Sequence, residues 1–186
     1  MAVKFEDTRI PDVKLVLPDK HGDARGFFSE VYKQSDWRAA GLEAVFVQDN
    51  HSYSAPVGTL RGLHFQLPPF AQDKLVRVTR GRILDIAVDI RRSSSTFGRH
   101  VAVELSAHNW RQLFIPIGFA HGFITLEPDT EVLYKVTNFY SAKHDYGLAF
   151  DDPDLAIEWP LTGEGPILSE KDRRHPRLCD LGELFP

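Results

Sequence analysis

The sequence predicts an all-β protein built as an antiparallel jelly-roll barrel with a few short peripheral helices. Short segments of alternating apolar and polar residues recur along the 186-residue chain and are separated by Gly, Pro and Asp. Helical patterns are few, and strands do not alternate with helices as they do in parallel α/β proteins. A jelly roll, in which two antiparallel sheets pack face to face, accommodates many short strands of this kind.

Residues 83–90 show the alternation most clearly. Their even-numbered positions are aliphatic, while Asp85 and Asp89 fall on the opposite face. This period of two predicts a half-buried strand whose acidic face is turned away from the apolar one. Residues 101–105 and 132–136 repeat the pattern, so we expect two further strands there.

Turn residues mark the boundaries between the expected elements. The pair Arg80-Gly81 predicts the turn of a hairpin into the strand that follows it. Residues 35–41 predict one short helix, with Ser35 as its N-cap and Gly41 as its C-terminal stop.

The chain is expected to form one domain, residues 1–186. Its length and its 42% hydrophobic content suffice for one continuous core. Residues 151–166 are rich in Pro, Gly and acidic residues and predict a loop, and residues 169–174 predict a further turn of helix. We therefore expect residues 151–186 to form a C-terminal segment that wraps the barrel.

Composition narrows the class of partner. A net charge of -4 and a pI near 6.0 argue against nonspecific binding to nucleic acid or to an anionic membrane, so a small-molecule partner is expected. The single cysteine, Cys179, cannot form an internal disulfide, which fits a reducing compartment. Because there is no signal-peptide pattern and no apolar run near the roughly 20 residues of a membrane span, we expect a cytoplasmic protein.

Two histidines at the edges of β-like segments mark the candidate site. His64 ends the run Gly58-Thr-Leu-Arg-Gly-Leu-His64, and His121 ends Pro116-Ile-Gly-Phe-Ala-His121. The second run reads Pro-x-Gly-x-x-His, which resembles the motif of the small barrels called cupins, where two such motifs face each other and usually hold a metal. The first run lacks the second His and the Glu of a metal-binding cupin, and metal sites generally recruit three or more protein ligands. The pattern therefore favours acid–base chemistry without a metal, and a structural histidine is the alternative interpretation of His64.

Two further side chains suit acid–base chemistry beside these histidines. Lys74 enters an apolar strand ten residues after His64, where its ammonium group could stabilise a developing enolate oxygen; a surface lysine is the alternative. Tyr134 lies on an otherwise aliphatic strand face and could act as a general acid, or it could be an aromatic residue of the barrel core.

Arg25 and Arg61 could each bind a phosphate through paired hydrogen bonds, although an isolated arginine is usually a surface residue. Strict alternation puts Arg61 and His64 on opposite faces of one strand. Both can serve one site only if Gly62 marks a β-bulge or if Arg61 precedes the regular strand. The sequence leaves these possibilities open.

Five motifs occur in order along the chain. They are Leu60-Arg-Gly-Leu-His-Phe-Gln66, Gln72-Asp-Lys-Leu-Val-Arg77, Ile115-Pro-Ile-Gly-Phe-Ala-His-Gly-Phe123, Leu133-Tyr-Lys-Val-Thr137 and Asp152-Pro-Asp-Leu-Ala-Ile-Glu-Trp-Pro160. Together they resemble the dTDP-4-dehydrorhamnose 3,5-epimerase family, and the likeness runs from about Ile10 to Asp172. The resemblance implies a metal-free cupin jelly roll, without a cofactor and working as a homodimer, that epimerises a dTDP-linked 4-keto-6-deoxy sugar in dTDP-L-rhamnose biosynthesis. Both C3 and C5 are α to the C4 ketone, so removal of either proton gives an enolate that can be reprotonated on the opposite face.

The resemblance also implies roles for individual residues. His64 matches the base, Tyr134 matches the acid, and Lys74 matches the group that stabilises the enolate at the C4 oxygen. Asp172 matches the carboxylate that orients His64, and Asp85 is a less favoured substitute for it. The substrate-binding positions that the resemblance implies are Arg25, Phe28, Glu30, Gln48, Asp49, Asn50, Arg61, His121, Tyr140, Asp145 and Lys171.

The chain departs from the family pattern at two places. Asp145 stands where many members carry Glu, and Phe65 replaces a frequent Tyr. The histidines outside the two motifs, among them His175, are expected to be structural or on the surface. A single-site epimerase acting at C3 or C5 alone, a metal-dependent cupin enzyme and a noncatalytic nucleotide-sugar binding module are the alternative functions.

Overall fold

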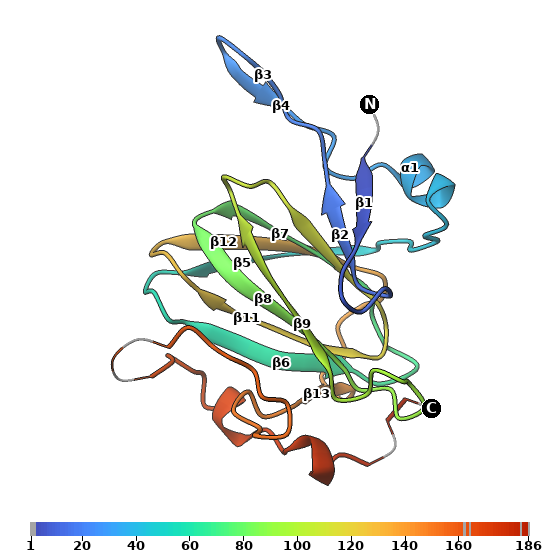
Figure 1. Ribbon diagram of the computed structural model, residues 1–186, viewed down its shortest axis with the longest axis vertical. Helices are drawn as coiled ribbons and strands as arrows, with labels where there is room; N and C mark the ends of the chain where they lie inside the picture. Colours follow the sequence, from blue (N-terminus) through green and yellow to red (C-terminus); the bar gives the residue numbers. More distant parts are fainter. Residues whose placement is uncertain (1–2, 162, 164, 183, 186) are drawn as a thin grey trace.

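Two antiparallel sheets packed face to face form the body of the chain (Figure 1). The structure is a computed structural model that describes residues 3–161, 163, 165–182 and 184–185. The six-stranded sheet consists, in spatial order, of β1 (Lys4–Asp7), β2 (Lys14–Leu17), β10 (Gln112–Ile115), β7 (Lys74–Arg80), β12 (Thr130–Val136) and β5 (Gln48–Ser54). The five-stranded sheet consists of β13 (Asp145–Gly147), β6 (Leu60–Gln66), β11 (Phe119–Thr125), β8 (Arg82–Asp89) and β9 (His100–Ser106). This arrangement confirms the predicted all-β, cupin-type jelly roll.

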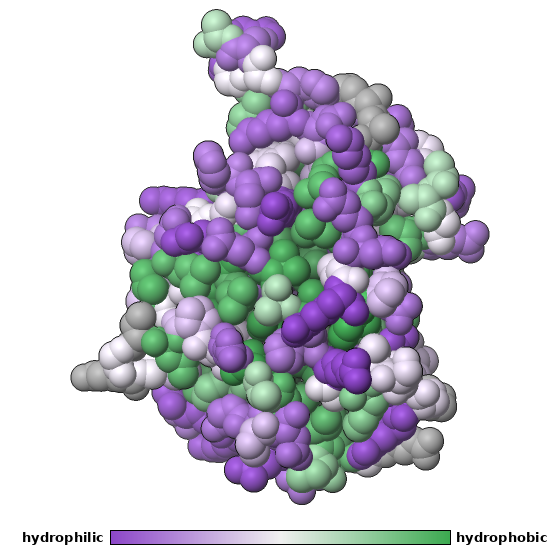
Figure 2. Space-filling model, viewed as in Figure 1, coloured by the Kyte–Doolittle hydropathy of each residue, from purple (hydrophilic) through white to green (hydrophobic). Residues whose placement is uncertain are grey.

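A third, two-stranded sheet stands apart from the body. It is the hairpin of β3 (His21–Asp23) and β4 (Gly26–Phe28), which projects from one end of the molecule (Figures 1 and 2). All residues of both strands are exposed. The hairpin therefore contributes nothing to the core of its own chain.

The one α-helix of the described chain, α1 (Gln34–Ala39), begins earlier than predicted. Ser35 lies inside the helix, and Lys33 is at the N-cap position without a side-chain cap bond. Trp37 is fully buried in an aromatic cluster, and this tertiary packing rather than a serine cap sets the start of the helix. Gly41 follows the helix with a φ of 79°, as expected of its C-terminal stop.

The predicted hairpin at Arg80-Gly81 is wrong. Strand β7 pairs with β10 and β12 in one sheet, whereas β8 pairs with β9 and β11 in the other. Gly81, with a φ of 77°, turns the chain from one sheet into the other, and a side chain there would collide with Thr130. Alternation alone cannot distinguish this crossing from a hairpin, because both join two strands of period two.

The predicted half-buried character of β8 is also wrong. Asp85 and Asp89 are completely buried, and they share the face of β8 that looks into the barrel with Ala87. The aliphatic face, including Ile86 and Val88, packs instead against the C-terminal segment. Strand β8 is therefore buried on both faces, and its inner face carries the two carboxylates.

Among the described residues of the C-terminal segment, Leu155, Leu178 and Phe185 pack against the outer face of the five-stranded sheet. The segment carries two 3-10 turns, η1 (Asp172–Arg174) and η2 (Leu178–Asp180), of which η1 agrees with the predicted helical turn at residues 169–174. A buried carboxylate ties its two ends together, because Asp152 Oδ2 accepts a hydrogen bond from the backbone N–H of Leu178 at 2.6 Å. Among the described residues, no helix is long and apolar enough to cross a membrane.

Candidate active site

A cavity of about 250 Å³ lies between the two sheets. Strands of both sheets and the C-terminal segment contribute to its wall. The four predicted catalytic residues all line it, although they come from β6, β7, β12 and η1. The lining residues are Ser52, Arg61, His64, Lys74, His121, Phe123, Tyr134, Ser169, Lys171 and Asp172.

His64 and Asp172 form a close pair at one side of this cavity. His64 Nε2 lies 2.6 Å from Asp172 Oδ1, and the Asp172 side chain is 5% exposed. Burial raises the pKa of Asp172, but hydrogen bonds from His175 and His64 outweigh burial and hold that pKa well below its usual range. An ionised carboxylate can only accept, so the His64 nitrogen that carries a proton toward Asp172 is Nε2, and the neutral form of the ring has its lone pair on Nδ1.

Lys74 is buried beside the same histidine. Its Nζ donates to the backbone oxygen of His64 at 3.2 Å. Burial lowers the pKa of Lys74 to about 8, against the opposing effect of the Asp145 and Asp85 carboxylates. The side chain is therefore mainly an ammonium ion at neutral pH, in surroundings where a positive charge interacts strongly with a nearby oxyanion.

Tyr134 reaches the cavity from the other sheet. It lies on β12, whereas His64 lies on β6. Burial raises the pKa of Tyr134, and Arg61 opposes this effect. The tyrosine therefore keeps its phenolic proton at neutral pH and can donate it.

A second histidine–carboxylate pair closes the inner wall of the cavity. His121 Nε2 lies 2.7 Å from Asp85 Oδ1, and both side chains are buried. Burial lowers the pKa of His121, against the effect of Asp85. His121 also lies directly opposite His64 in the register of β11 and β6. The structure therefore pairs Asp85 with His121, while Asp172 contacts His64.

Gly62 resolves how Arg61 and His64 can face one cavity. The pairing of β6 with β11 shifts register at this point, and Gly62 has a φ of 129°. A Cβ atom on Gly62 would lie 2.5 Å from the Cα atom of Gly122. The bulge that the sequence left as one possibility is present, and it requires a glycine.

Three further predicted residues form a polar cluster near the mouth of the cavity. The Tyr140 hydroxyl donates to Asp145 Oδ2 at 3.1 Å, and Lys171 Nζ lies 2.5 Å from the same oxygen. The shorter Asp145 side chain thus makes direct contacts with both groups. Tyr140 is 62% exposed, so its ring is free to stack on a ligand.

The predicted residues of the projecting hairpin lie away from the cavity. Arg25 bonds only to Asp23 among the described residues, and Phe28 is 62% exposed. Glu30 follows the hairpin and does not line the cavity. Within one chain, Arg25, Phe28 and Glu30 do not meet the catalytic residues.

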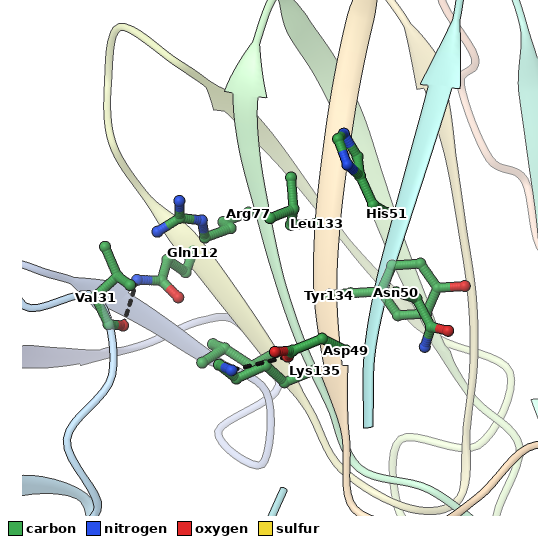
Figure 3. Close-up of a pocket in the computed structure, with 10 residues that line it drawn as sticks. Val31, Asp49, Asn50, His51, Arg77, Gln112, Leu133, Tyr134 and Lys135 are labelled. Atoms are coloured by element: carbon green, nitrogen blue, oxygen red, sulfur yellow. Dashed lines mark hydrogen bonds and ion pairs between the residues drawn. The ribbon is translucent and has the colours of Figure 1, made fainter. Parts of the chain in front are cut away.

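The run Gln48-Asp49-Asn50 on β5 is divided between two faces of its sheet. Gln48 and Asn50 share the inner side with Tyr134 and bond to each other at 2.8 Å. Asp49 points outward and pairs with Lys135 Nζ at 2.8 Å (Figure 3). It borders a second cavity, also of about 250 Å³, on the outer face, where Gln112 donates to the backbone oxygen of Val31. Strand alternation therefore keeps Asp49 out of the inner cavity.

Sequence reasoning missed the position of His175. Its Nε2 lies 3.3 Å from Asp172 Oδ1, the atom that also contacts His64. His175 follows the predicted helical turn of residues 169–174 directly, and its spacing of three residues from Asp172 is the signal in the sequence that could have found it. The ligand atoms of His64, Asp172 and His175 all lie within 4.8 Å of one another, so these groups also form a donor set that could accept a metal ion.

The packed sheets and the side chains between them define a cupin-class jelly roll with an acid–base site. Residues 7–180 match the family model described as dTDP-4-dehydrorhamnose 3,5-epimerase. The chain belongs to that family, as the five sequence motifs predicted.

Relatives and solved structures agree with this assignment. The dTDP-4-dehydrorhamnose 3,5-epimerase of Sinorhizobium fredii is 54% identical over 181 residues, which cover 97% of this chain and 92% of the relative. The structure of the Bacillus anthracis enzyme of the same name, with TDP and PPi bound, is 52% identical, covers 95% of this chain and 99% of its own, and has a TM-score of 0.91. The Legionella pneumophila dTDP-6-deoxy-D-glucose-3,5-epimerase, in complex with dTDP-4-keto-L-rhamnose, is 43% identical with a TM-score of 0.94, and the match covers 99% of this chain and 97% of that one.

The burial of Lys74 predicts a variant that is more stable than the wild type. At pH 7, folding moves the charged amine out of water, so Lys74→Met should raise the free energy of unfolding by roughly 1–3 kcal/mol. Between pH 8 and 10.5 the unfolded wild-type chain binds more protons than the folded one, because burial lowers the folded pKa from 10.5 to about 8. The wild type therefore gains stability across this range, and the advantage of Lys74→Met should shrink.

Urea denaturation at pH 7 and at pH 10 measures this difference. Lys4→Met is the matched control, because Lys4 is exposed on β1 and its replacement should give no gain that depends on pH. A Lys74→Met variant that is less stable than the wild type at pH 7, or a gain that does not change with pH, would contradict the prediction.

Proposed function

We propose that this protein is an isomerase that inverts C3 and C5 of dTDP-4-dehydro-6-deoxy-D-glucose to give dTDP-4-dehydro-L-rhamnose, a step of dTDP-L-rhamnose biosynthesis. The observation that carries the proposal is that His64 and Tyr134 reach one cavity from opposite sheets. Inversion needs a base on one face of the sugar carbon and an acid on the other. A sugar ring lying between the two sheets meets both.

The first half of the reaction is proton abstraction. His64 Nδ1 takes the proton from C5 or C3, and the electron pair of the broken C–H bond moves through the adjacent carbon to the C4 oxygen. The Lys74 ammonium stabilises the negative charge that forms on that oxygen. Asp172 stabilises the positive charge that forms on the His64 ring, because the two groups are hydrogen bonded at 2.6 Å.

The second half is reprotonation from the other face. The Tyr134 hydroxyl gives its proton to the same carbon, and the electron pair returns from the C4 oxygen to re-form the ketone. His64 is then protonated and Tyr134 is a phenolate, so exchange with solvent must restore both groups before the next inversion. Each inverted carbon thereby carries a hydrogen that came from water.

The nucleotide portion of the substrate extends from this cavity toward its mouth. Arg61 lines the cavity, and Lys171 and Tyr140 meet at Asp145 beside it. A guanidinium and an ammonium group suit a diphosphate, and an exposed tyrosine ring suits a base. The TDP bound to the Bacillus anthracis relative supports this assignment.

We further propose that the enzyme acts as a homodimer in the cytoplasm. The exposed hairpin carries Arg25 and Phe28 away from the cavity of its own chain, with Glu30 just after it. A two-fold dimer can bring each hairpin to the cavity of the partner subunit, where these three residues complete the nucleotide-binding region. The lone Cys179, a free thiol, fits a reducing compartment.

Deuterium exchange tests the proposed reaction. The protein is incubated in heavy water, with EDTA present, with dTDP-4-dehydro-6-deoxy-D-glucose, and the sugar is analysed by mass spectrometry. Two deuterium atoms per sugar are expected, and His64→Ala should lower the rate of exchange by on the order of 10³-fold. His51→Ala is the control, because exposed His51 contacts Glu131 on the outer face.

Each other result of this experiment points elsewhere. One deuterium per sugar would indicate a single-site epimerase. Exchange that EDTA abolishes would indicate a metal-dependent enzyme. Binding of the nucleotide sugar without any deuterium exchange would indicate a noncatalytic binding module.

Subunit mixing tests the proposed dimer. Arg25→Ala and His64→Ala should each be inactive, because each damages every site of its own homodimer. After random reassociation, half of the dimers are mixed and each contains one intact site, so about a quarter of the wild-type activity should return. Light scattering that shows a monomer, or dimers that exchange subunits without any recovery of activity, would contradict the proposal.

A further inference from the structure

His175 is a histidine with a nearly buried side chain that the proposed reaction does not use. It follows η1 directly, three residues after Asp172. Its side chain is 7% exposed, and its Nε2 lies 3.3 Å from Asp172 Oδ1. His64 contacts the same oxygen atom at 2.6 Å, so one carboxylate oxygen lies between two imidazole rings.

The fold makes room for this second ring at a glycine. Gly147 on β13 is the cross-strand partner of His64 on β6. A Cβ atom on Gly147 would lie 2.2 to 2.3 Å from three atoms of the His175 ring. Gly147 does not have a left-handed φ, so space for His175 rather than backbone conformation accounts for the glycine.

The contact has a direct electrostatic consequence for Asp172. A carboxylate that is nearly removed from water tends to bind a proton, and a protonated Asp172 could no longer hold His64 in the tautomer with its lone pair on Nδ1. His175 supplies the first of the hydrogen bonds that offset this effect of burial. Its ring also lies edge-on to the His64 ring, with the ring centroids 5.4 Å apart, which limits the tilt of His64.

We propose that His175 is a positioning residue that fixes the orientation of Asp172, so that His64 presents Nδ1 to the substrate. The inference rests on the proposed epimerisation and adds a member to its machinery. His175 touches neither the substrate nor the reacting atoms. Its loss should therefore slow the chemical step and leave substrate binding almost unchanged.

Two substitutions separate the hydrogen bond from the packing. His175→Phe keeps a ring above Gly147 but removes the donor, whereas His175→Gln keeps an N–H group at the same distance from the backbone. In the deuterium-exchange assay, His175→Phe should lower kcat about tenfold with KM changed less than twofold, and His175→Gln should restore kcat to within about threefold of the wild type. His108→Phe is the control, because His108 is exposed on a turn.

Nitrogen-15 NMR of the histidine rings reports the tautomer of His64, which a loss of packing alone should not change. The wild type should show His64 with its proton on Nε2, and His175→Phe should show a mixture of the two tautomers. Wild-type kcat and an unchanged His64 tautomer in His175→Phe would overturn the inference. Equal losses in the Phe and Gln variants, with lowered thermal stability, would assign His175 a structural role only.

A double-mutant cycle keeps the test decisive if His175→Phe folds poorly. Gly147→Ala pushes the His175 ring away without altering it, so it should lower kcat in the wild type and have little effect in a His175→Ala background. Equal effects in both backgrounds would contradict the inference. If the wild type itself incorporates no deuterium, the proposed epimerisation fails. If the wild type incorporates deuterium and the variants do so at the same rate, the inference about His175 alone fails.

Discussion

The contact between the C-terminal segment and the outer face of the five-stranded sheet is the constraint on which both fold and site depend. Leu155, Leu178 and Phe185 pack there with Ile86 and Val88 of β8. Burying side chains of this size stabilises the fold by roughly 1.5–3 kcal/mol each. The outward aliphatic face of β8 thereby becomes core, so that the inward face is free to carry charged groups.

The same contact delivers the residues that contact His64, the proposed base. The C-terminal segment brings Asp172 and His175 against β6, where His64 lies. A chain that loses this packing loses the Asp172 contact at the same time. Stability and reactivity therefore depend on one interface within the chain.

Burial and hydrogen bonds give the titratable side chains of the cavity different protonation states. It lowers the pKa of Lys74 to about 8 and raises that of Tyr134, while hydrogen bonds keep Asp172 ionised. One wall thus offers a base with a carboxylate behind it, and the other offers a neutral acid. Groups whose environments push their pKa values apart in this way are suited to complementary roles in proton transfer.

Much of the site was predictable because short motifs place chemistry on strands. The Pro-x-Gly-x-x-His run and the family motifs predicted that His64, Lys74 and Tyr134 would serve one site, and all three line one cavity. Gly62 was recognised as a possible bulge because two useful side chains lay on faces that alternation would separate.

The features that the sequence did not predict depend on contacts between segments that are distant along the chain. Alternation showed that β8 has two faces, but only the C-terminal segment decides that Asp85 points inward to His121. The position of Asp49 on the outer face follows from the register of β5 with β12. His175 belongs to no motif, and its place beside Asp172 follows from packing against Gly147.

The claim that a base and an acid lie on opposite walls is tested most directly by incubating the substrate with Tyr134→Phe in heavy water. The deuterium content and the configuration of the recovered sugar are then measured. Because His64 remains, the enolate should still form. It should then accept deuterium on the face from which the proton was removed, so the recovered substrate should carry deuterium with its configuration retained. Epimerised product should fall by on the order of a hundredfold. Product formed at the wild-type rate, or a complete absence of exchange with His64 intact, would contradict a base and an acid on opposite walls.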